Sequence, residues 1–235
     1  MRSGMIGFLG AQPPSAGDPY WESVVSLQHF DNDIVDEAGL MWTGSPSYSD
    51  SPVPVFGKEL SSPLGSPSVI STTLGSRWDG VSQFTIEAFV TQSAPTTTSN
   101  QFPGIISKRT EGLPTDDFSL IVAYTIGDAI NFSCTDTAGV RRSFSTSTAL
   151  SIGVRTHVAV TADGSFLRIF VGGAMVLETA FSATLRNNSY PVYVGRTGTA
   201  TNLNWVGKID ELRITRDVAR YTEPFTPPSA PFQNY

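Results

Sequence analysis

The stretch that most constrains the fold of this chain runs from Gly153 to Leu177 and reads as three short strands joined by two tight turns. Residues 156–161 alternate in polarity, and residues 166–171 form a second alternating run. Asp163-Gly164 and Gly172-Gly173 supply residues that tolerate the positive φ angles of hairpin turns. A meander of this kind has one apolar face to cover, and the sequence offers no amphipathic helix of useful length to cover it. We therefore expect a second sheet to pack against it.

The same alternation recurs along most of the chain. Further strands are expected at residues 21–30, 41–43, 69–74, 84–90, 104–108, 118–123, 130–134, 141–148, 190–195 and 205–215. About twelve short strands punctuated by turns, with no helical period, predict an all-β fold: a two-sheet antiparallel β-sandwich of the jelly-roll kind. Residues 44–67 contain five prolines, a density that no interior strand tolerates, so we expect a long irregular excursion there.

Composition supports strands and excludes several kinds of partner. Only 15% of the residues are charged, while Ser, Thr, Gly and Pro are abundant, which disfavours a helical protein. The net charge is -6, and no stretch concentrates Lys and Arg, so nucleic acid is not an expected partner. No apolar run approaches the roughly 18 residues that span a bilayer, and the N-terminus lacks the pattern of a signal peptide. We therefore expect no membrane partner.

The chain divides into one domain with two extensions. Residues 1–19 show no strand or helix period and contain three prolines, which is typical of a flexible tail. We interpret them instead as an N-terminal docking arm that contacts a neighbouring surface. Residues 20–218 form the predicted sandwich, and residues 219–235 form a proline-rich C-terminal tail that ends all regular structure.

A family resemblance is carried by several stretches taken in order. They are FTIEAFV at 84–90, IISK at 105–108, GVRTHVAVT at 153–161, LRIFVGG at 167–173, VYVG at 192–195 and GKIDELRI at 207–214. Together they resemble the laminin-G-like branch of the concanavalin A-like lectin/glucanase superfamily, which implies a concanavalin A-like sandwich over roughly residues 20 to 218. Two positions depart from the pattern: Arg155 stands where a tryptophan is usual, and Gly172 where an aspartate is common.

The two ends of the domain carry a narrower resemblance. Residues 18–31 and residues 217–228 look like parts of sandwich domains carried by tailed-phage virion proteins. This resemblance implies a structural protein of a bacteriophage particle, made in the host cytoplasm and located in the virion, where it decorates or connects the surface of capsid or tail. Its expected partners are other virion proteins, in a homo-oligomer or a symmetric assembly.

The sequence lacks the pattern of a catalytic site. Glycoside hydrolysis needs two carboxyl groups beside one bond, and the hydrolytic relatives place theirs on one face of a strand, two and four residues apart. Asp210 and Glu211 are adjacent, so on a regular strand they point to opposite faces. We expect them to be structural carboxylates, bonded to loops or paired with Arg213 and Lys208. The two histidines have no neighbours at metal-ligand spacing, and no G-x-S-x-G motif is present, so we expect no enzyme.

A carbohydrate-binding adhesion module that recognises host surface glycans is the alternative function. Lectin sites combine an aromatic platform with a few polar groups on loops, and the candidates chosen by residue type are Tyr48, Trp78, Asp79, Asn202, Asn204 and Trp205. For the two tryptophans, packing in the core is the alternative interpretation. No cofactor is expected, with one alternative: calcium, held by loop carboxylates at Asp31, Asp33 and Asp36. Their spacing does not fit an EF-hand loop, and a solvated turn is the competing interpretation.

Overall fold

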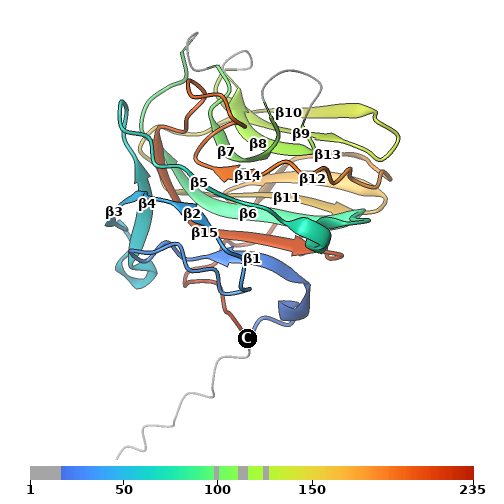
Figure 1. Ribbon diagram of the computed structural model, residues 1–235, viewed down its shortest axis with the longest axis horizontal. Coiled ribbons are helices and arrows are strands. Elements are labelled where there is room, and N and C mark those ends of the chain that lie inside the picture. Colours follow the sequence, from blue (N-terminus) through green and yellow to red (C-terminus); the bar gives the residue numbers. More distant parts are fainter. Residues whose placement is uncertain (1–16, 98–100, 111–115, 124–126) are drawn as a thin grey trace, which may run out of the picture.

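A computed structural model describes residues 17–97, 101–110, 116–123 and 127–235 and shows two antiparallel sheets stacked face to face (Figure 1). The two-sheet antiparallel β-sandwich predicted from the sequence is confirmed. Within these ranges the only helical elements are three 3-10 turns: η1 (Trp21–Ser23), η2 (Pro54–Phe56) and η3 (Gly75–Trp78). No helix in this part of the chain is long and apolar enough to cross a bilayer.

The larger sheet, sheet A, has the strand order β13-β12-β11-β6-β15-β4-β3, and β1 also pairs with β15. Its strands are β1 (Val24–Gln28), β3 (Ser47–Asp50), β4 (Lys58–Ser62), β6 (Gln83–Gln92), β11 (Thr156–Asp163), β12 (Phe166–Val171), β13 (Ala174–Ala180) and β15 (Gly207–Arg216). Sheet B has the order β10-β9-β8-β7-β14-β5-β2. Its strands are β2 (Thr43–Gly44), β5 (Ile70–Thr72), β7 (Gly104–Lys108), β8 (Phe118–Ala123), β9 (Ala129–Thr135), β10 (Arg141–Ala149) and β14 (Val192–Val194).

The predicted central meander is formed by β11, β12 and β13. Val158 and Val160 on β11 are fully buried against sheet B, as the alternation indicates. At the first turn Gly164 has φ +88°, and the Asp163 carboxylate accepts hydrogen bonds from the backbone N–H groups of Ser165 and Phe166, both at 2.8 Å. The turn therefore rests on glycine for its backbone angle and on aspartate for its hydrogen bonds.

The core lies between the sheets and consists of the inward residues of both. Trp78 packs there against Phe118 and Phe84, with ring centroids 5.4 and 6.0 Å apart. The single cysteine, Cys134, is also buried, and this burial raises the pKa of its thiol to about 12. A neutral buried thiol packs as a small apolar group and is no nucleophile.

The expectation of an irregular excursion over residues 44–67 is wrong. Strands β3 and β4 form within it, and β4 is an interior strand that lies between β15 and β3. The reason is the position of the prolines, since Pro54 and Pro63 flank β4 and none falls inside it. Every residue of β4 therefore keeps the N–H group that ladder pairing requires.

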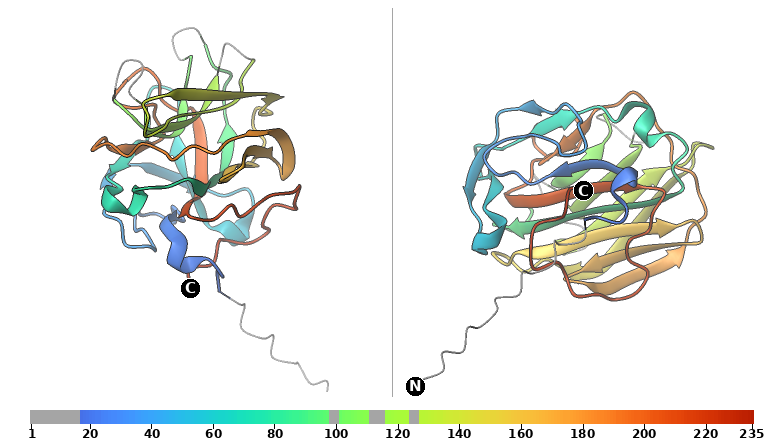
Figure 2. Two further views of the ribbon diagram at one scale, coloured as in Figure 1. Left: turned by 90° about the vertical axis from the view of Figure 1, so that its right-hand side faces the viewer. Right: turned by 90° about the horizontal axis from the view of Figure 1, so that it is seen from below.

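The C-terminal tail, residues 219–235, covers the outer face of sheet A as a third layer (Figure 2). It has no regular secondary structure, yet it is tied to the sheet, because the Phe225 N–H donates to the Gly173 carbonyl at 3.0 Å and Phe232 is buried. Of the expected docking arm, residues 1–16 lie outside the described residues. Gly17 lies against Tyr235, so these two residues meet below sheet A, on the side away from sheet B (Figure 1).

Candidate functional site

The outer face of sheet A holds a buried network of charged side chains centred on Glu87. One Glu87 oxygen accepts a hydrogen bond from Arg213 Nε at 2.9 Å, and the other accepts from His157 Nε2 at 3.0 Å and Tyr221 OH at 2.8 Å. Asp18 joins through Arg213 Nη1 at 2.9 Å. Burial alone would raise the pKa of Glu87, but Arg213 and His157 outweigh it and lower that pKa to about 2. The carboxylate is therefore held ionised within the protein.

The prediction that Asp210 and Glu211 point to opposite faces is wrong, because β15 contains a β-bulge. Pairing with β6 shifts between Asp210 and Arg213, and Glu211 has φ +49°. Two residues of β15 then oppose one residue of β6, so that both carboxylates lie on the outer side of the sheet. Their partners come from that side: Arg155 for Asp210 and His29 for Glu211.

These two carboxylates belong to the same covered layer and not to a cleft. Asp210 accepts from Arg155 Nη2 at 2.5 Å, and Glu211 accepts from the N–H of Phe232 in the tail at 2.7 Å. Their exposures are 1% and 0%, and burial together with the Glu211 charge raises the pKa of Asp210 to about 8. Neither carboxyl reaches a surface where a glycosidic bond could lie. The expected role as structural carboxylates fits this arrangement.

One of the two expected kinds of partner is confirmed, because Arg155, His29 and Phe232 lie in loop or tail segments. The other expected pairing, with Arg213 and Lys208, is wrong. Arg213 pairs with Glu87 and Asp18, and Lys208 pairs with Glu59 at 3.3 Å. The outward alternation of β15 explains this, because it places each of the two cations beside a carboxylate of a different strand or segment.

The predicted ligand residues do not form one site. Trp78 is completely buried in the core, so its ring offers no face to a ligand. Tyr48 is half-buried on β3, in contact with the core. Asp79 accepts a hydrogen bond from Asn187 Nδ2 at 2.6 Å, on another part of the surface.

Three of the candidates do come together. Asn202, Asn204 and Trp205 line a hollow of about 420 Å³ beside Leu64 and Pro67. Trp205 itself is only 1% exposed, and its Nε1 donates to the Lys208 carbonyl at 3.2 Å. The tryptophan ring is therefore part of the packing under this hollow and not an open platform.

The candidate metal ligands act as hydrogen-bond acceptors within the loops. Asp36 is buried and accepts from Ser26 Oγ at 2.5 Å and Trp42 Nε1 at 2.8 Å. Asp31 accepts from the Lys58 N–H, and Asp33 accepts from the Val35 N–H. Among the described residues no group of three or more His, Cys, Asp and Glu side chains is arranged to hold a metal ion. Calcium binding stays a prediction, and a melting temperature measured with and without EDTA tests it.

A better candidate lies on the outer face of sheet B, where sequence reasoning placed nothing. A cavity of about 420 Å³ opens over β8, β9 and β10, and we call it the sheet B groove. Its lining includes Phe102, Arg109, Asn131, Arg141, Ser143 and Ser145. Asn131 Nδ2 donates to the hydroxyl oxygens of Ser143 at 3.0 Å and Ser145 at 2.8 Å, which gives the floor an ordered polar surface.

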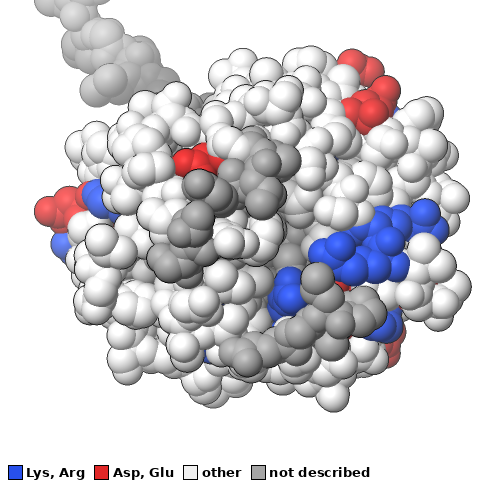
Figure 3. Space-filling model, turned by 90° about the horizontal axis from the view of Figure 1, so that it is seen from above, with Lys and Arg blue, Asp and Glu red and all other residues white. Residues whose placement is uncertain are grey.

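Positive charge gathers on the same face. Figure 3 views the molecule from the sheet B side, and Lys and Arg side chains cluster there in one area. Arg109 and Arg141 line the groove, and Arg196 follows the end of β14, with its guanidinium 4.6 Å from the Tyr193 ring centroid. These arginines are far apart in the sequence. A search for consecutive cations cannot find such a cluster. The alternating Asn and Ser residues of β9 and β10, in contrast, could have indicated a polar outer face in the sequence.

Comparison with known proteins agrees with this fold. Residues 65–222 match the profile of the concanavalin A-like lectin/glucanases superfamily, and the chain belongs to this superfamily. No curated protein matches its sequence.

Solved structures with the same fold include several binding domains. The binding domain of Paraclostridial Mosquitocidal Protein 1 superposes with a TM-score of 0.64 at 15% identity, over 86% of this chain and 50% of that one. The botulinum neurotoxin serotype G binding domain gives 0.61 at 14% identity, over 83% and 48%. Domain 4 of AbnA, an extracellular arabinanase from Geobacillus stearothermophilus solved with arabinotriose, gives 0.59 at 17% identity, over 83% and 92%. The chain thus spans about half of each toxin domain, and at these identities the likeness shows the fold alone.

Proposed function

We propose that this protein is a non-enzymatic glycan-binding module that holds its ligand in the sheet B groove. The observation that carries the proposal is the composition of this groove: an ordered amide and hydroxyl floor beside the apolar side chains of Phe102 and Leu203. Sugars present hydroxyl groups at their edges and apolar C–H faces, so a concave site of this kind suits them. The cavity volume of about 420 Å³ is within the range of small-molecule sites.

The comparisons support this choice over catalysis. The AbnA domain was solved with an oligosaccharide, and it shares the fold over most of its length. In the present chain the buried carboxylates of sheet A are engaged with arginine, histidine and the tail. The sheet B groove supplies polar and apolar groups that can bind a ligand. Its described lining contains no pair of carboxylates that could act on one glycosidic bond.

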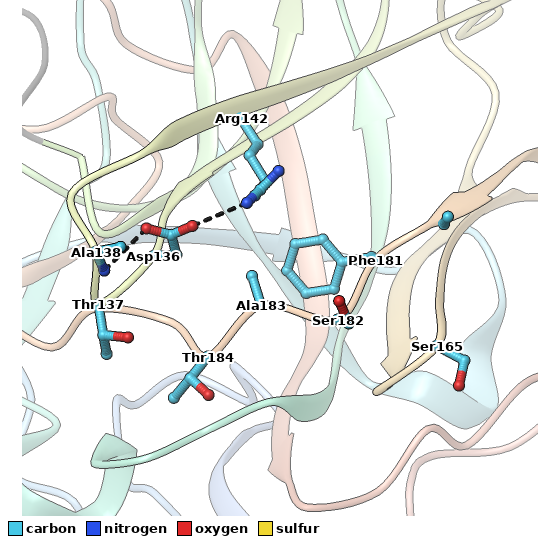
Figure 4. Close-up of a pocket in the computed structure, with 10 residues that line it drawn as sticks. Asp136, Thr137, Ala138, Arg142, Ser165, Phe181, Ser182, Ala183 and Thr184 are labelled. Atoms are coloured by element: carbon cyan, nitrogen blue, oxygen red, sulfur yellow. Dashed lines mark hydrogen bonds and ion pairs between the residues drawn. The ribbon is translucent and has the colours of Figure 1, made fainter.

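A blocking substitution tests the proposal. Ser143 is exposed on β10 at the groove, so Ser143→Trp fills the cavity without changing the core. Thr137→Trp is the matched control, because Thr137 is also exposed and lines a separate hollow of the molecule (Figure 4). On a glycan array we expect binding by the wild type and by Thr137→Trp, and loss with Ser143→Trp. Equal binding by both variants would contradict the proposed site.

A structural role in a tailed-phage virion is the second candidate. The two end segments that resemble phage sandwich domains are joined in the structure, because Asp18 accepts from Arg220 Nη2 at 2.7 Å and from Arg213 Nη1 at 2.9 Å. The two ends thus act as one unit on sheet A, which supports their assignment to one kind of domain. A deletion of residues 1–16 keeps Asp18, and it should abolish incorporation into particles if the arm docks there. Normal incorporation of this variant would count against the docking arm.

A further inference from the structure

We infer that the sheet B groove selects anionic glycans, whose carboxylate or sulfate group is bound by Arg141 together with Arg109. This inference rests on the proposed function and adds the class of ligand. It starts from the position of the two arginines, since both line the cavity whose floor is formed by Asn131 and the serines of β10. A guanidinium group offers several N–H donors in one plane, a geometry that matches the oxygens of a carboxylate or a sulfate.

Arg141 is held in place from beneath. Its Nε donates to Asp116 Oδ1 at 2.9 Å, and the other Asp116 oxygen accepts from Ser133 Oγ at 2.6 Å. Asp116 is completely buried, whereas the Arg141 side chain remains 31% exposed. The carboxylate therefore orients the guanidinium without itself facing the cavity. Such support from a second layer pre-organises a binding group and lowers the entropy cost of capturing a ligand.

Arg109 brings a second guanidinium to the same cavity. Burial lowers the pKa of Arg109, and the nearby positive charge of Arg141 lowers it further, while Asp116 opposes both. The two cations are thus close enough to interact. Asp116 supplies one negative charge against these two positive charges, so the three groups together remain net positive, which favours an anionic ligand over a neutral one.

A glycine allows Arg109 to lie where it does. Gly198 has φ +60°, and a side-chain Cβ there would lie 2.8 Å from Arg109 Cγ. The Gly198 carbonyl also accepts from Arg196 Nε at 2.9 Å, which draws a third guanidinium toward the same end of the sheet. The close packing at Gly198 therefore positions positive charge beside the groove.

The neighbouring residue of β10 supplies an internal comparison. Arg142 points to the other side of the strand and donates to Asp136 Oδ2 at 2.9 Å in a separate hollow (Figure 4). Asp136 lines that hollow together with Arg142, so cation and carboxylate face the same space. Arg141 and Arg142 thus lie on the same strand, and each pairs with its own aspartate, but their surroundings differ.

This pair defines the experiment. Arg141→Gln and Arg142→Gln each remove one positive charge and leave one aspartate with an amide partner, so they change the net charge equally. Wild type, both variants and Ser143→Trp are applied to an array of neutral, uronic-acid-bearing, sialylated and sulfated oligosaccharides. Affinities for the best binders are then measured at two salt concentrations, and the unfolding of each variant confirms its fold.

The expected result is binding of anionic glycans that weakens with salt, falls by about tenfold or more in Arg141→Gln and changes little in Arg142→Gln. The carboxylated and sulfated arms distinguish which anion is preferred. Binding of neutral glycans that Ser143→Trp abolishes and Arg141→Gln does not affect would overturn this inference and leave the proposed function standing. Absence of binding to every glycan would overturn both.

Discussion

The two outer faces of this sandwich share one core and differ in almost everything else. On sheet A, Glu87 and Arg213 are buried, ion-paired with each other and covered by Tyr221 and Phe232 of the tail. On sheet B, Ser143 and Arg141 are exposed around a cavity. Glu87 and Arg213 therefore have no access to ligands, and they hold the tail and Asp18 against sheet A. The polar residues around the sheet B groove are accessible to a ligand. Both outer faces are polar, and they differ in whether their polar side chains are buried or exposed.

The largest expected effect breaks the network on sheet A. Glu87→Ala leaves Arg213 and His157 buried without their shared carboxylate, which should cost about 3–5 kcal/mol of unfolding free energy. Glu178→Ala is the control, since Glu178 also pairs with an arginine but is 43% exposed, and it should cost less than about 1 kcal/mol. Urea unfolding measures both, and similar losses would show that the buried network has no special role.

A second prediction concerns acid. Because the pKa of Glu87 falls from 4.5 to about 2 on folding, its ionised form contributes roughly 3 kcal/mol of stability above pH 4.5. This contribution should disappear as the pH falls toward 2, and Glu87→Gln should make the unfolding free energy less dependent on pH in that acid range.

Asp210 should change stability with pH in the opposite direction. Its pKa rises to about 8 on folding, so the native protein keeps a proton that the unfolded chain releases near pH 4. Stability should therefore decline between pH 4 and 8, and Asp210→Asn should remove that decline.

A pH series of urea titrations on wild type and the two variants checks both signs. The slope of stability against pH should differ between each variant and wild type only in the pH window of the substituted group. A Glu87→Gln protein with an unchanged acid limb would contradict the ionised state assigned to Glu87.

The smallest effect on stability is expected at the groove. Phe102 is half-buried at the wall of the cavity, so Phe102→Ala should cost about 1 kcal/mol or less of unfolding free energy. The same substitution removes apolar contact area from the proposed ligand and should weaken glycan affinity severalfold. A large loss of stability in Phe102→Ala with unchanged glycan affinity would show that Phe102 has a structural role and not a binding role, contrary to this prediction.

The sequence allowed the sandwich, the central meander and the inward residues of β6 to be predicted, because strand alternation depends on local pattern alone. It did not allow β4 to be predicted, since proline density was counted across residues 44–67 without regard to the gaps between prolines. The bulge at Glu211 was also invisible. Without it, Arg213 would turn inward and Leu212 outward, so a single extra residue keeps the charges of β15 out of the core.

The candidate site was harder to predict than the fold. Aromatic and polar residues were chosen by type, and Trp78 and Trp205 proved to be buried. The groove depends on Phe102, Arg109 and Arg141, which come from different segments and meet only through the register of sheet B. Pairing between distant strands sets that register, and no local pattern encodes it.

Gly17 and Tyr235 meet below sheet A, on the side of the molecule opposite the sheet B groove. Anything tethered through either of these residues would leave from the side opposite the sheet B groove. A support that carries the domain by that side would present the groove outward, toward whatever approaches from solution. The proposed binding groove and the meeting point of Gly17 and Tyr235 therefore lie at opposite poles of one small sandwich.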